Sequence, residues 1–349
     1  MAEKKLKNKK SKANYSFIIA LEEVIFDIPE RSRKILKSRF GVSSGLSKTL
    51  EEIGQEYKIT RERVRQIIKE ILRKIGLKRG HQNFQEVKSK IEFTISQKSG
   101  IISKKELAEN LTGNDLRERG ALNVFLEVMG GLIQKPEDGK TGHIVALSSF
   151  DFSNWEETIE TAEKILSDYG DVLHSEDLFK KILKVKEINS ESLYHYLAVS
   201  KRIGKNNFGK WGLAHWKEIN PKVIWQKTYL VLKEEKKPLH FRQIAALIDI
   251  HYPGKRKTHP QTVHNELIKN QHFVLVGRGT YALSVWGYKK GTVKEVLEEI
   301  LKKNEKPMKK NEIIDNVMKK RRVKKSTVLI NLNNFFLRVG KDAYTVEKR

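Results

Sequence analysis

Four copies of one sequence pattern, spaced about 70 residues apart, constrain the fold of this 349-residue chain more than any other feature. In each copy an apolar residue is followed by a short polar stretch, then by an acidic or amide residue, and then by a second apolar residue. The copies are residues 102–107, 173–178, 239–244 and 308–313, and their starts are 71, 66 and 69 residues apart. A spacing this regular indicates a small structural unit repeated along the chain.

The residues around each copy indicate what that unit is. A helical pattern precedes each copy, at residues 84–97, 155–169, 223–233 and 293–303. Two further helices and a β-hairpin are expected after it. This is the element order of a winged helix, so we expect four tandem winged helices, in a mainly α-helical fold with small β-hairpin wings. The tight turns are expected at residues 277–280 and 340–343 and a longer wing at residues 135–142. The alternative is one larger α+β domain with accidental similarity.

A helix-turn-helix is expected ahead of the repeats. Thr49 and Glu52 have the spacing of a capping box and start a short helix. Gly54 allows a second helix to approach closely, and Thr60 is a good N-cap for a helix running from Arg61 to about Ile75. At about 100° per residue, that helix separates an apolar face from a polar one. The apolar face contains Val64, Ile67, Ile68, Ile71, Leu72 and Ile75.

The polar side chains gather at the N-terminal end of the second helix, which is the end of a recognition helix that enters the major groove. Arginine can bind guanine through two hydrogen bonds, glutamate can accept from cytosine, and glutamine can pair with adenine. The alternative is an amphipathic surface helix of mixed charge. The polar face contains Arg61, Glu62, Arg65, Gln66 and Lys69.

These residues also resemble a known family. Residues 30–78 are similar to region 4 of the sigma-70 family of bacterial RNA polymerase sigma factors, and the matching stretches are residues 30–33, 39–41, 49–54, 60–67 and 72–75. The resemblance implies binding to the minus-35 promoter element and to the β flap of RNA polymerase. It implies that Arg61, Glu62, Arg65 and Gln66 face bases. Phosphate or polymerase contacts are expected for Thr60, Arg63, Lys69 and Arg73. Ile68, where an acidic residue is usual, and Lys58, where Gly or Asp is common, depart from the family pattern.

Only about 29 residues precede this match. A sigma factor also needs an aromatic-rich helix that melts the promoter, and those residues do not supply one. We therefore expect a region 4 module joined to other domains, and not a complete sigma factor.

The third repeat has a resemblance of its own. Residues 221–287 are similar to the HARE-HTH family, which includes the δ subunit of Gram-positive RNA polymerase. The match rests on residues 238–240, Ile244, residues 262–263, Leu267, Phe273, residues 277–279 and residues 281–283. The resemblance implies a winged helix that associates with nucleic acid or with polymerase.

Basic residues in the last two repeats are the further expected phosphate contacts. In the third repeat a helix is expected from His259–Pro260 through Leu267, because Pro260 suits the first helical position. In the fourth, Ser326 is expected to cap a helix over residues 327–334. The alternative is an ordinary solvated loop. The expected contacts are Lys255, Arg256, Lys257, Arg278, Arg321, Arg322, Lys324 and Lys325.

Charge supports a polyanionic partner, since the formal net charge is +26. Residues 1–80 hold 21 Lys+Arg against 10 Asp+Glu, and residues 81–220 hold 19 against 21. Residues 221–290 hold 13 against 4, and residues 291–349 hold 16 against 8. A near-neutral middle thus separates two basic ends, and the ends are the parts expected to touch double-stranded DNA.

Several classes of protein are not expected. The chain has no cysteine, which excludes disulfides and thiolate metal sites. His251, His259 and His264 match no ligand spacing, and no phosphate-binding or dinucleotide motif is present. The lysine-rich start has no apolar core of a signal peptide, and no apolar run is long enough to span a bilayer. We expect no catalytic residue, metal, cofactor, small-molecule substrate or membrane partner.

The sequence therefore predicts a DNA-binding transcription factor of the bacterial RNA polymerase machinery, located in the cytoplasm at the nucleoid. Two alternatives remain: a δ-like polymerase subunit acting mainly by protein binding, and the DNA-reading component of a restriction or defence system. The expected domains are a disordered basic tail (1–14), the sigma region 4-like domain (15–80), and winged-helix units at 81–150, 151–220, 221–290 and 291–349. These four units are called repeats 1 to 4 below.

Overall fold

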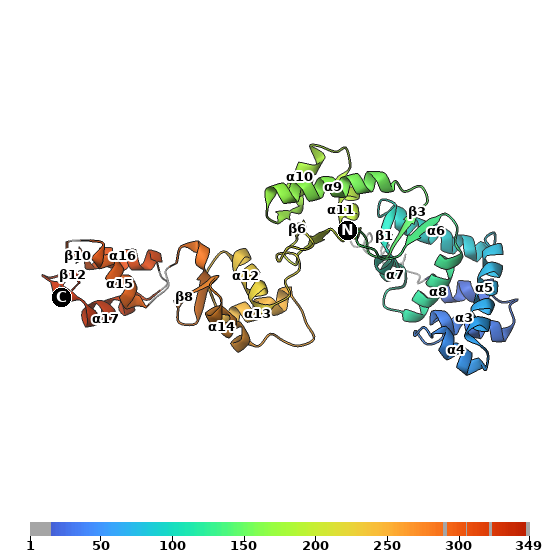
Figure 1. Cartoon of the computed structure of the whole chain (residues 1–349), viewed down its shortest axis with the longest axis horizontal. Coiled ribbons are helices and arrows are strands. Elements are labelled where there is room, and N and C mark those ends of the chain that lie inside the picture. The colour runs from blue at the N-terminus through green and yellow to red at the C-terminus, as the bar shows by residue number, and fades with distance from the viewer. Residues whose placement is uncertain (1–14, 289–291, 305, 321–322, 347–349) are drawn as a thin grey trace, which may run out of the picture. The chain divides into compact units, whose positions relative to one another are not determined.

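The computed structural model describes residues 15–288, 292–304, 306–320 and 323–346 (Figure 1). The tail expected at residues 1–14 lies outside these ranges, as do Arg321 and Arg322. The described residues are mainly helical with small antiparallel sheets, as predicted. The chain divides into two compact units, Met1–Tyr169 with Glu176–Gly204 and Gly170–Ser175 with Lys205–Arg349. No helix in the described ranges is long and apolar enough to cross a membrane.

The helix-turn-helix forms where its capping residues predict it. The Thr49 side chain accepts from the Glu52 amide and Glu52 bonds back to Thr49, which completes the expected capping box. The Thr60 side chain accepts from the Arg63 amide and starts the second helix. That helix ends two residues later than expected. The helices of this module are α2 (Phe17–Val24), α3 (Glu30–Phe40), α4 (Leu50–Tyr57) and α5 (Arg61–Leu77).

The turn between α4 and α5 is tight. A Cβ atom at Gly54 would lie 2.8 Å from the Ile59 carbonyl oxygen, so only glycine permits this approach. Lys58 ends α4 in the left-handed conformation, with φ of 55°. The turn therefore adopts a conformation that suits glycine at the position where this chain has lysine.

Repeats 1 and 2 share one order of elements: helix, strand, two helices, two strands. Repeat 1 consists of α6 (Gln82–Ser96), β1 (Ile101–Ser103), α7 (Lys104–Thr112), α8 (Leu116–Val128), β2 (Leu132–Lys135) and β3 (Ile144–Leu147). Repeat 2 consists of α9 (Phe152–Tyr169), β4 (Leu173–His174), α10 (Ser175–Leu183), α11 (Ser190–Val199), β5 (Ile203–Lys205) and β6 (Lys210–Leu213).

Repeats 3 and 4 follow the same order. Repeat 3 consists of α12 (Ile224–Glu235), β7 (Leu239–His240), α13 (Phe241–His251), α14 (Pro260–Lys269), β8 (Phe273–Gly277) and β9 (Thr280–Leu283). Repeat 4 consists of α15 (Val293–Lys302), β10 (Met308–Lys309), α16 (Lys310–Lys320), α17 (Lys325–Phe335), β11 (Leu337–Val339) and β12 (Ala343–Thr345). In each repeat the last strand lies between the other two and pairs antiparallel.

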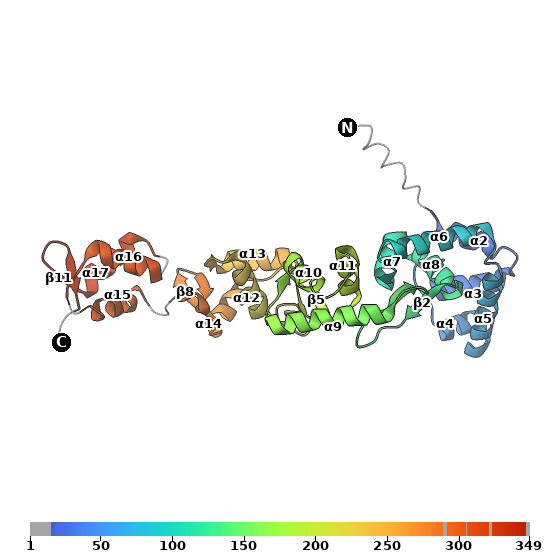
Figure 2. The same ribbon diagram turned by 90° about the horizontal axis from the view of Figure 1, so that it is seen from above.

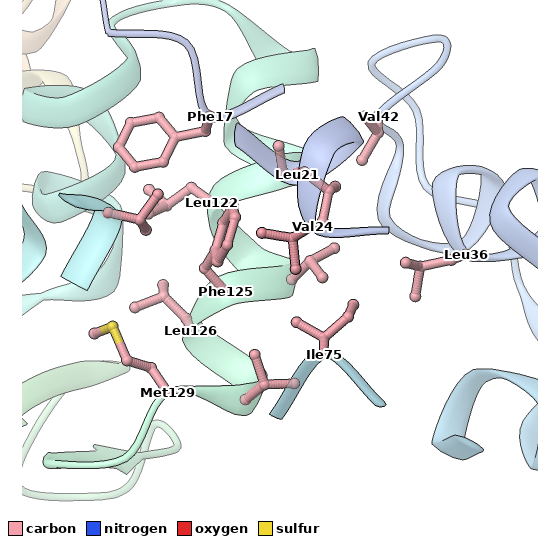
Figure 3. Packing of buried hydrophobic residues seen from close by; sticks show 14 of the residues in the cluster. Phe17, Leu21, Val24, Leu36, Val42, Ile75, Leu122, Phe125, Leu126 and Met129 are labelled. Atoms are coloured by element: carbon pink, nitrogen blue, oxygen red, sulfur yellow. The ribbon is translucent and has the colours of Figure 1, made fainter. Parts of the chain in front are cut away.

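The helix-turn-helix module and repeat 1 share one hydrophobic core. Helix α8 packs against α2, α3 and α5, and Figure 2 shows it among these helices. Figure 3 shows Leu122 and Phe125 of α8 among apolar side chains of the module, with Phe17 and Ile75 close by. All four are fully buried. The shared core that supports α5 therefore includes helices of repeat 1 and extends well beyond residue 80.

Polar contacts reinforce the same junction. The Glu118 carboxylate of α8 accepts hydrogen bonds from the Phe17 and Ile18 amides (2.7 and 3.2 Å) at the start of α2. Arg79 donates to the Val128 carbonyl at the end of α8 (2.8 Å), and Arg117 donates to the Val42 carbonyl (3.2 Å). Both ends of α8 are therefore hydrogen-bonded to the module.

Repeats 3 and 4 each have a small core of their own. The third helix of each contributes two buried residues: Val263 and Leu267 from α14, and Val328 and Leu332 from α17. Most of the surface of these two helices is left to solvent.

Candidate nucleic-acid interface

The exposed face of α5 carries the residues predicted to read bases. Its opposite face is in the shared core, where Val64, Ile68, Ile71 and Ile75 are buried. Burial of that apolar face fixes the rotation of the helix and directs the polar face to solvent. The exposed residues of this face are Arg61, Glu62, Arg65, Gln66, Lys69 and Arg73.

A hydrogen-bonded network joins three of the four predicted base readers. The Arg65 guanidinium donates two bonds to the Glu62 carboxylate, at 2.8 and 2.6 Å. Gln66 donates to the same carboxylate at 3.3 Å and accepts from Arg63 at 3.4 Å. Arg61, at the first position of α5, lies outside these bonds. The structure thus brings Glu62, Arg65 and Gln66 together before any ligand binds.

The network stabilises the charged forms of Glu62 and Arg65. Hydrogen bonds from Arg65 hold the pKa of the Glu62 carboxyl below its ordinary value, and bonds to Glu62 raise the pKa of Arg65. Both side chains remain more than half exposed, at 57% and 55%. Glu62 is therefore an ionised acceptor at neutral pH, and water or a base edge can reach it.

Helices α3 and α4 hold α5 in place from behind. Arg31 of α3 donates to the Tyr57 carbonyl at the end of α4 (2.9 Å), and Arg39 donates to the Lys48 carbonyl (2.9 Å) just before α4 begins. These bonds use backbone acceptors at both ends of the first helix of the helix-turn-helix. The turn is thus fixed to α3 as well as to α5.

A hollow of about 320 Å³ separates α3 from α5 on the side of Arg63. Its wall contains apolar side chains, including Ile35 and Ile67, and charged ones, including Arg31 and Glu70. Arg63 was predicted to contact phosphate or polymerase, and it lies at the edge of this hollow as well as beside Gln66.

The predicted contacts of repeat 3 lie on exposed loops. Lys255, Arg256 and Lys257 are exposed between α13 and α14, in a loop that Asp249 closes by accepting from the Thr258 amide at 2.8 Å. Pro260 occupies the first turn of α14, as predicted. Arg278 is exposed at the turn between β8 and β9.

In repeat 4 the predicted helix start was wrong. α17 begins at Lys325, with Lys324 as its N-cap, and Ser326 lies inside the first turn. The Lys324 backbone is extended and its carbonyl accepts from the Thr327 amide at 2.9 Å, so the helix starts without a side-chain cap. Lys324 and Lys325 are both exposed at this helix start.

Sequence reasoning missed the residues that fix the orientation of the interface. Glu118, Arg79 and Arg117 join α8 to the module, and no local pattern marks them, because their partners are backbone atoms far away in sequence. One local signal was available. Gly120 stands inside α8, and an isolated glycine in a helix usually has a packing reason.

The strained turn gives a first testable prediction. Replacing Lys58 by glycine relieves a left-handed conformation that costs a side chain about 1–2 kcal/mol, while added freedom of the unfolded chain cancels part of the gain. We expect the free energy of unfolding to rise by about 0.5–1 kcal/mol in urea denaturation. DNA sequence preference should not change, because Lys58 lies outside the exposed face of α5. A loss of stability would show that the lysine side chain makes a needed contact.

Comparison with known proteins identifies part of the chain. The sequence model for "Sigma-70, region 4" matches residues 24–75. Over 55 residues the chain is 49% identical to RNA polymerase sigma factor SigA of Nostoc sp. (strain PCC 7120), 46% to SigA of Bacillus sp. and 44% to SigA of Clostridium acetobutylicum. These alignments cover 16% of this chain and 14–15% of the relatives. The chain therefore shares one short module, including α3, α4 and most of α5, with sigma factors.

Proposed function

We propose that this protein is a DNA-binding transcription factor of the bacterial RNA polymerase machinery, which reads a minus-35-like promoter element through α5. The observation that carries the proposal is the exposed, hydrogen-bonded set of Glu62, Arg65 and Gln66 at the N-terminal end of α5, within residues that match sigma region 4. A helix so placed can enter the major groove with its first two turns.

Each predicted base reader has a chemical role in this proposal. Arg61 and Arg65 donate to guanine, Glu62 accepts from cytosine and Gln66 pairs with adenine. The hydrogen bonds between Glu62 and Arg65 break, and each side chain then bonds to a base edge instead. Phosphate contacts by Lys69 and Arg73 fix the register of the helix on the duplex.

We further propose polymerase as the protein partner. The hollow between α3 and α5 is lined by apolar and charged side chains, Arg63 among them, so we propose it as the site for a side chain of the β flap. Thr60, at the start of α5, is a further proposed contact. The work of the protein is then recognition, with no catalytic residue, cofactor or metal. Among the described residues no group of three histidine, aspartate or glutamate side chains is placed to hold a metal ion. The proposed location is the cytoplasm, at the nucleoid.

We propose that the four repeats are winged helices and that repeat 3 is a HARE-HTH domain. Two observations support this proposal. The repeats share one element order, and each has a three-stranded sheet with its last strand in the centre. The exposed Lys255, Arg256, Lys257 and Arg278 of repeat 3 and Lys324 and Lys325 of repeat 4 are the proposed phosphate contacts.

The base-reading assignment is tested by changing Glu62 and Gln66 to alanine. We expect preference for the selected site over random DNA to fall about ten- to a hundredfold, because one good base contact contributes about 1–3 kcal/mol of discrimination. Affinity for random duplex should be retained or rise slightly, since Arg65 loses its carboxylate partner. Selection from random DNA followed by fluorescence anisotropy measures both quantities.

A matched control changes Glu70 and Lys74 to alanine, on the same helix but away from its tip. Glu70→Ala removes a carboxylate that pairs with Lys74 at 3.0 Å, and its effect on sequence preference should be small. Unchanged preference in the Glu62 and Gln66 variant would contradict base reading by α5. An equal effect of the Glu70 and Lys74 changes would show that general charge on α5 matters, and not the predicted base contacts.

A second candidate function is that of a polymerase accessory subunit acting mainly by protein binding. The near-neutral charge of residues 81–220 favours it for that part of the chain, because a DNA-binding surface is normally basic. Pull-down of tagged protein from extract separates the two functions. Copurification with polymerase after nuclease treatment, without sequence-specific DNA binding, would favour the accessory subunit.

A further inference from the structure

Each repeat has two parts that could meet DNA, its third helix and its hairpin loop. The third helices are α8, α11, α14 and α17, and the hairpin loops are residues 136–143, 206–209, 278–279 and 340–342. The repeats differ in whether these parts are exposed to solvent or packed against another part of the chain. This difference assigns different roles to the repeats.

In repeat 1 the third helix is unavailable. Seven of the 13 residues of α8 are buried, and the helix packs against α2, α3 and α5. A Cβ atom at Gly120 would lie 2.4 Å from the Phe40 carbonyl oxygen, so the backbones of α8 and α3 are in direct contact. DNA cannot reach the middle of this helix without breaking the shared core.

The hairpin loop of repeat 1 is also occupied. Thr141 is buried and forms a β-bridge with Ser200 of repeat 2. The Lys201 amide donates to the Lys140 carbonyl at 2.8 Å, and the Lys201 ammonium donates to the Asp138 carbonyl at 3.0 Å and pairs with Glu137. This loop serves as a connector between repeats 1 and 2.

Repeat 2 follows the same pattern. Its third helix, α11, packs against β1 of repeat 1, where Ser99 bonds to Ser192 at 3.0 Å and to His195 at 3.1 Å. Its hairpin loop reaches repeat 3. The Phe208 ring packs on the core of repeat 3, 4.4 Å from the His251 ring, and the Asn207 side chain donates to the His251 carbonyl.

Repeats 3 and 4 are different. Their third helices bury two residues each, and exposed residues on α14 include Gln261, Thr262 and Asn265. Arg278 at the hairpin turn of repeat 3 and Lys341 at that of repeat 4 are exposed. Charge divides the repeats at the same place: residues 81–220 hold 19 Lys+Arg against 21 Asp+Glu, and residues 221–349 hold 29 against 12.

We infer that repeats 3 and 4 form a second contact with the backbone of duplex DNA, and that repeats 1 and 2 form none and act as a scaffold. The inference deepens the proposed function and rests on it for the identity of the ligand. The second contact binds phosphates without regard to sequence, because the exposed side chains next to α14 and α17 are lysine and arginine. It adds affinity to the sequence preference of α5.

The test compares two triple variants of the full-length chain with equal net charge. The first is Lys255→Ala, Arg256→Ala and Lys257→Ala, in repeat 3. The matched control is Lys164→Ala, Lys180→Ala and Lys184→Ala, in repeat 2, where all three lysines are also exposed. Fluorescence anisotropy with random-sequence duplex, repeated over a range of salt concentrations, measures affinity and its salt dependence. Circular dichroism confirms that both variants fold.

We expect the repeat 3 variant to bind random duplex about ten- to a hundredfold more weakly, and its log–log salt slope to fall by up to about 3. The repeat 2 control should stay within about twofold of the parent. An equal loss in both variants, or no loss in the first, would overturn the inference. So would unchanged DNA affinity combined with lost copurification of polymerase, since the basic loop would then bind protein.

The two proposals fail in different ways. If the parent protein shows no preference among sequences, reading by α5 is wrong, while the loss in the repeat 3 variant still supports the second contact. If the preference is present and the repeat 3 variant binds random duplex normally, only the second contact is wrong. In the repeat 3 variant the ratio of selected to random affinity should equal that of the parent.

Discussion

Replacing Gly120 by alanine should destabilise the shared core by about 3 kcal/mol, one of the largest effects of any single methyl group in this chain. The new Cβ atom would lie 2.4 Å from the Phe40 carbonyl oxygen and 3.0 Å from the Val42 amide nitrogen, and both belong to backbone that cannot rotate away. The helices would have to separate. Thermal and urea denaturation of the full-length chain should show a lower midpoint for the unit that contains α5, together with weaker sequence preference.

Gly76→Ala is the matched control. Gly76 is also inside a helix, α5, but a Cβ atom there meets no other atom within 4 Å. Alanine should therefore stabilise this position slightly, by up to about 0.5 kcal/mol, because Gly76 lies in the last turn of α5 and the gain of about 0.5–1 kcal/mol applies to a helix interior. If both changes act in the same direction, the contact between α8 and α3 does not limit stability.

A fragment of residues 15–80 should fail to fold, whereas residues 15–220 should fold and keep their DNA sequence preference. The short fragment lacks α6 and α8, so side chains such as Phe17 and Ile75 lose the apolar partners that bury them. It also loses the Glu118 carboxylate at the start of α2. A chain of this length can bury only a small hydrophobic core, so it tolerates little loss of apolar contacts. Circular dichroism and anisotropy on a selected duplex provide the two measurements.

The longer fragment serves as the control for truncation itself. It lacks repeats 3 and 4, so it should bind random duplex more weakly than the full chain while its preference for the selected site persists. A cooperative unfolding transition for residues 15–80 alone would contradict a required role of α8 in the module.

Local signals in the sequence predicted local structure well. The capping box at Thr49 and the N-cap at Thr60 depend on atoms three residues apart, so a sequence pattern contains them completely. The apolar period of α5 likewise determined which face is exposed. The predicted N-cap at Ser326 was wrong. An extended residue can start a helix through its carbonyl alone, and serine is also tolerated within the first turn.

The partner of a buried face could not be predicted in this way. The sequence of α8 shows an apolar helix, and such a helix can pack on its own repeat or on another module. Its contacts with α2 and α3 join residues roughly 80–110 positions apart, and no alternation or spacing encodes them. The docking of hairpin loops onto the next repeat is equally non-local, since it depends on Ser200 and His251 for backbone partners.

The pairing of Glu62 with Arg65 has a consequence for how the protein finds its site. A lone carboxylate at the tip of α5 would be repelled by every phosphate it passes. Paired with Arg65, its charge is compensated within the tip, where Arg61 and Arg63 are also exposed, and under the proposed function Lys69 and Arg73 further along α5 hold the helix near the duplex. Under that function the protein would diffuse along non-cognate DNA with Glu62 and Arg65 bonded to each other. It would stop where the bases offer a donor and an acceptor that replace the hydrogen bonds lost when the pair opens.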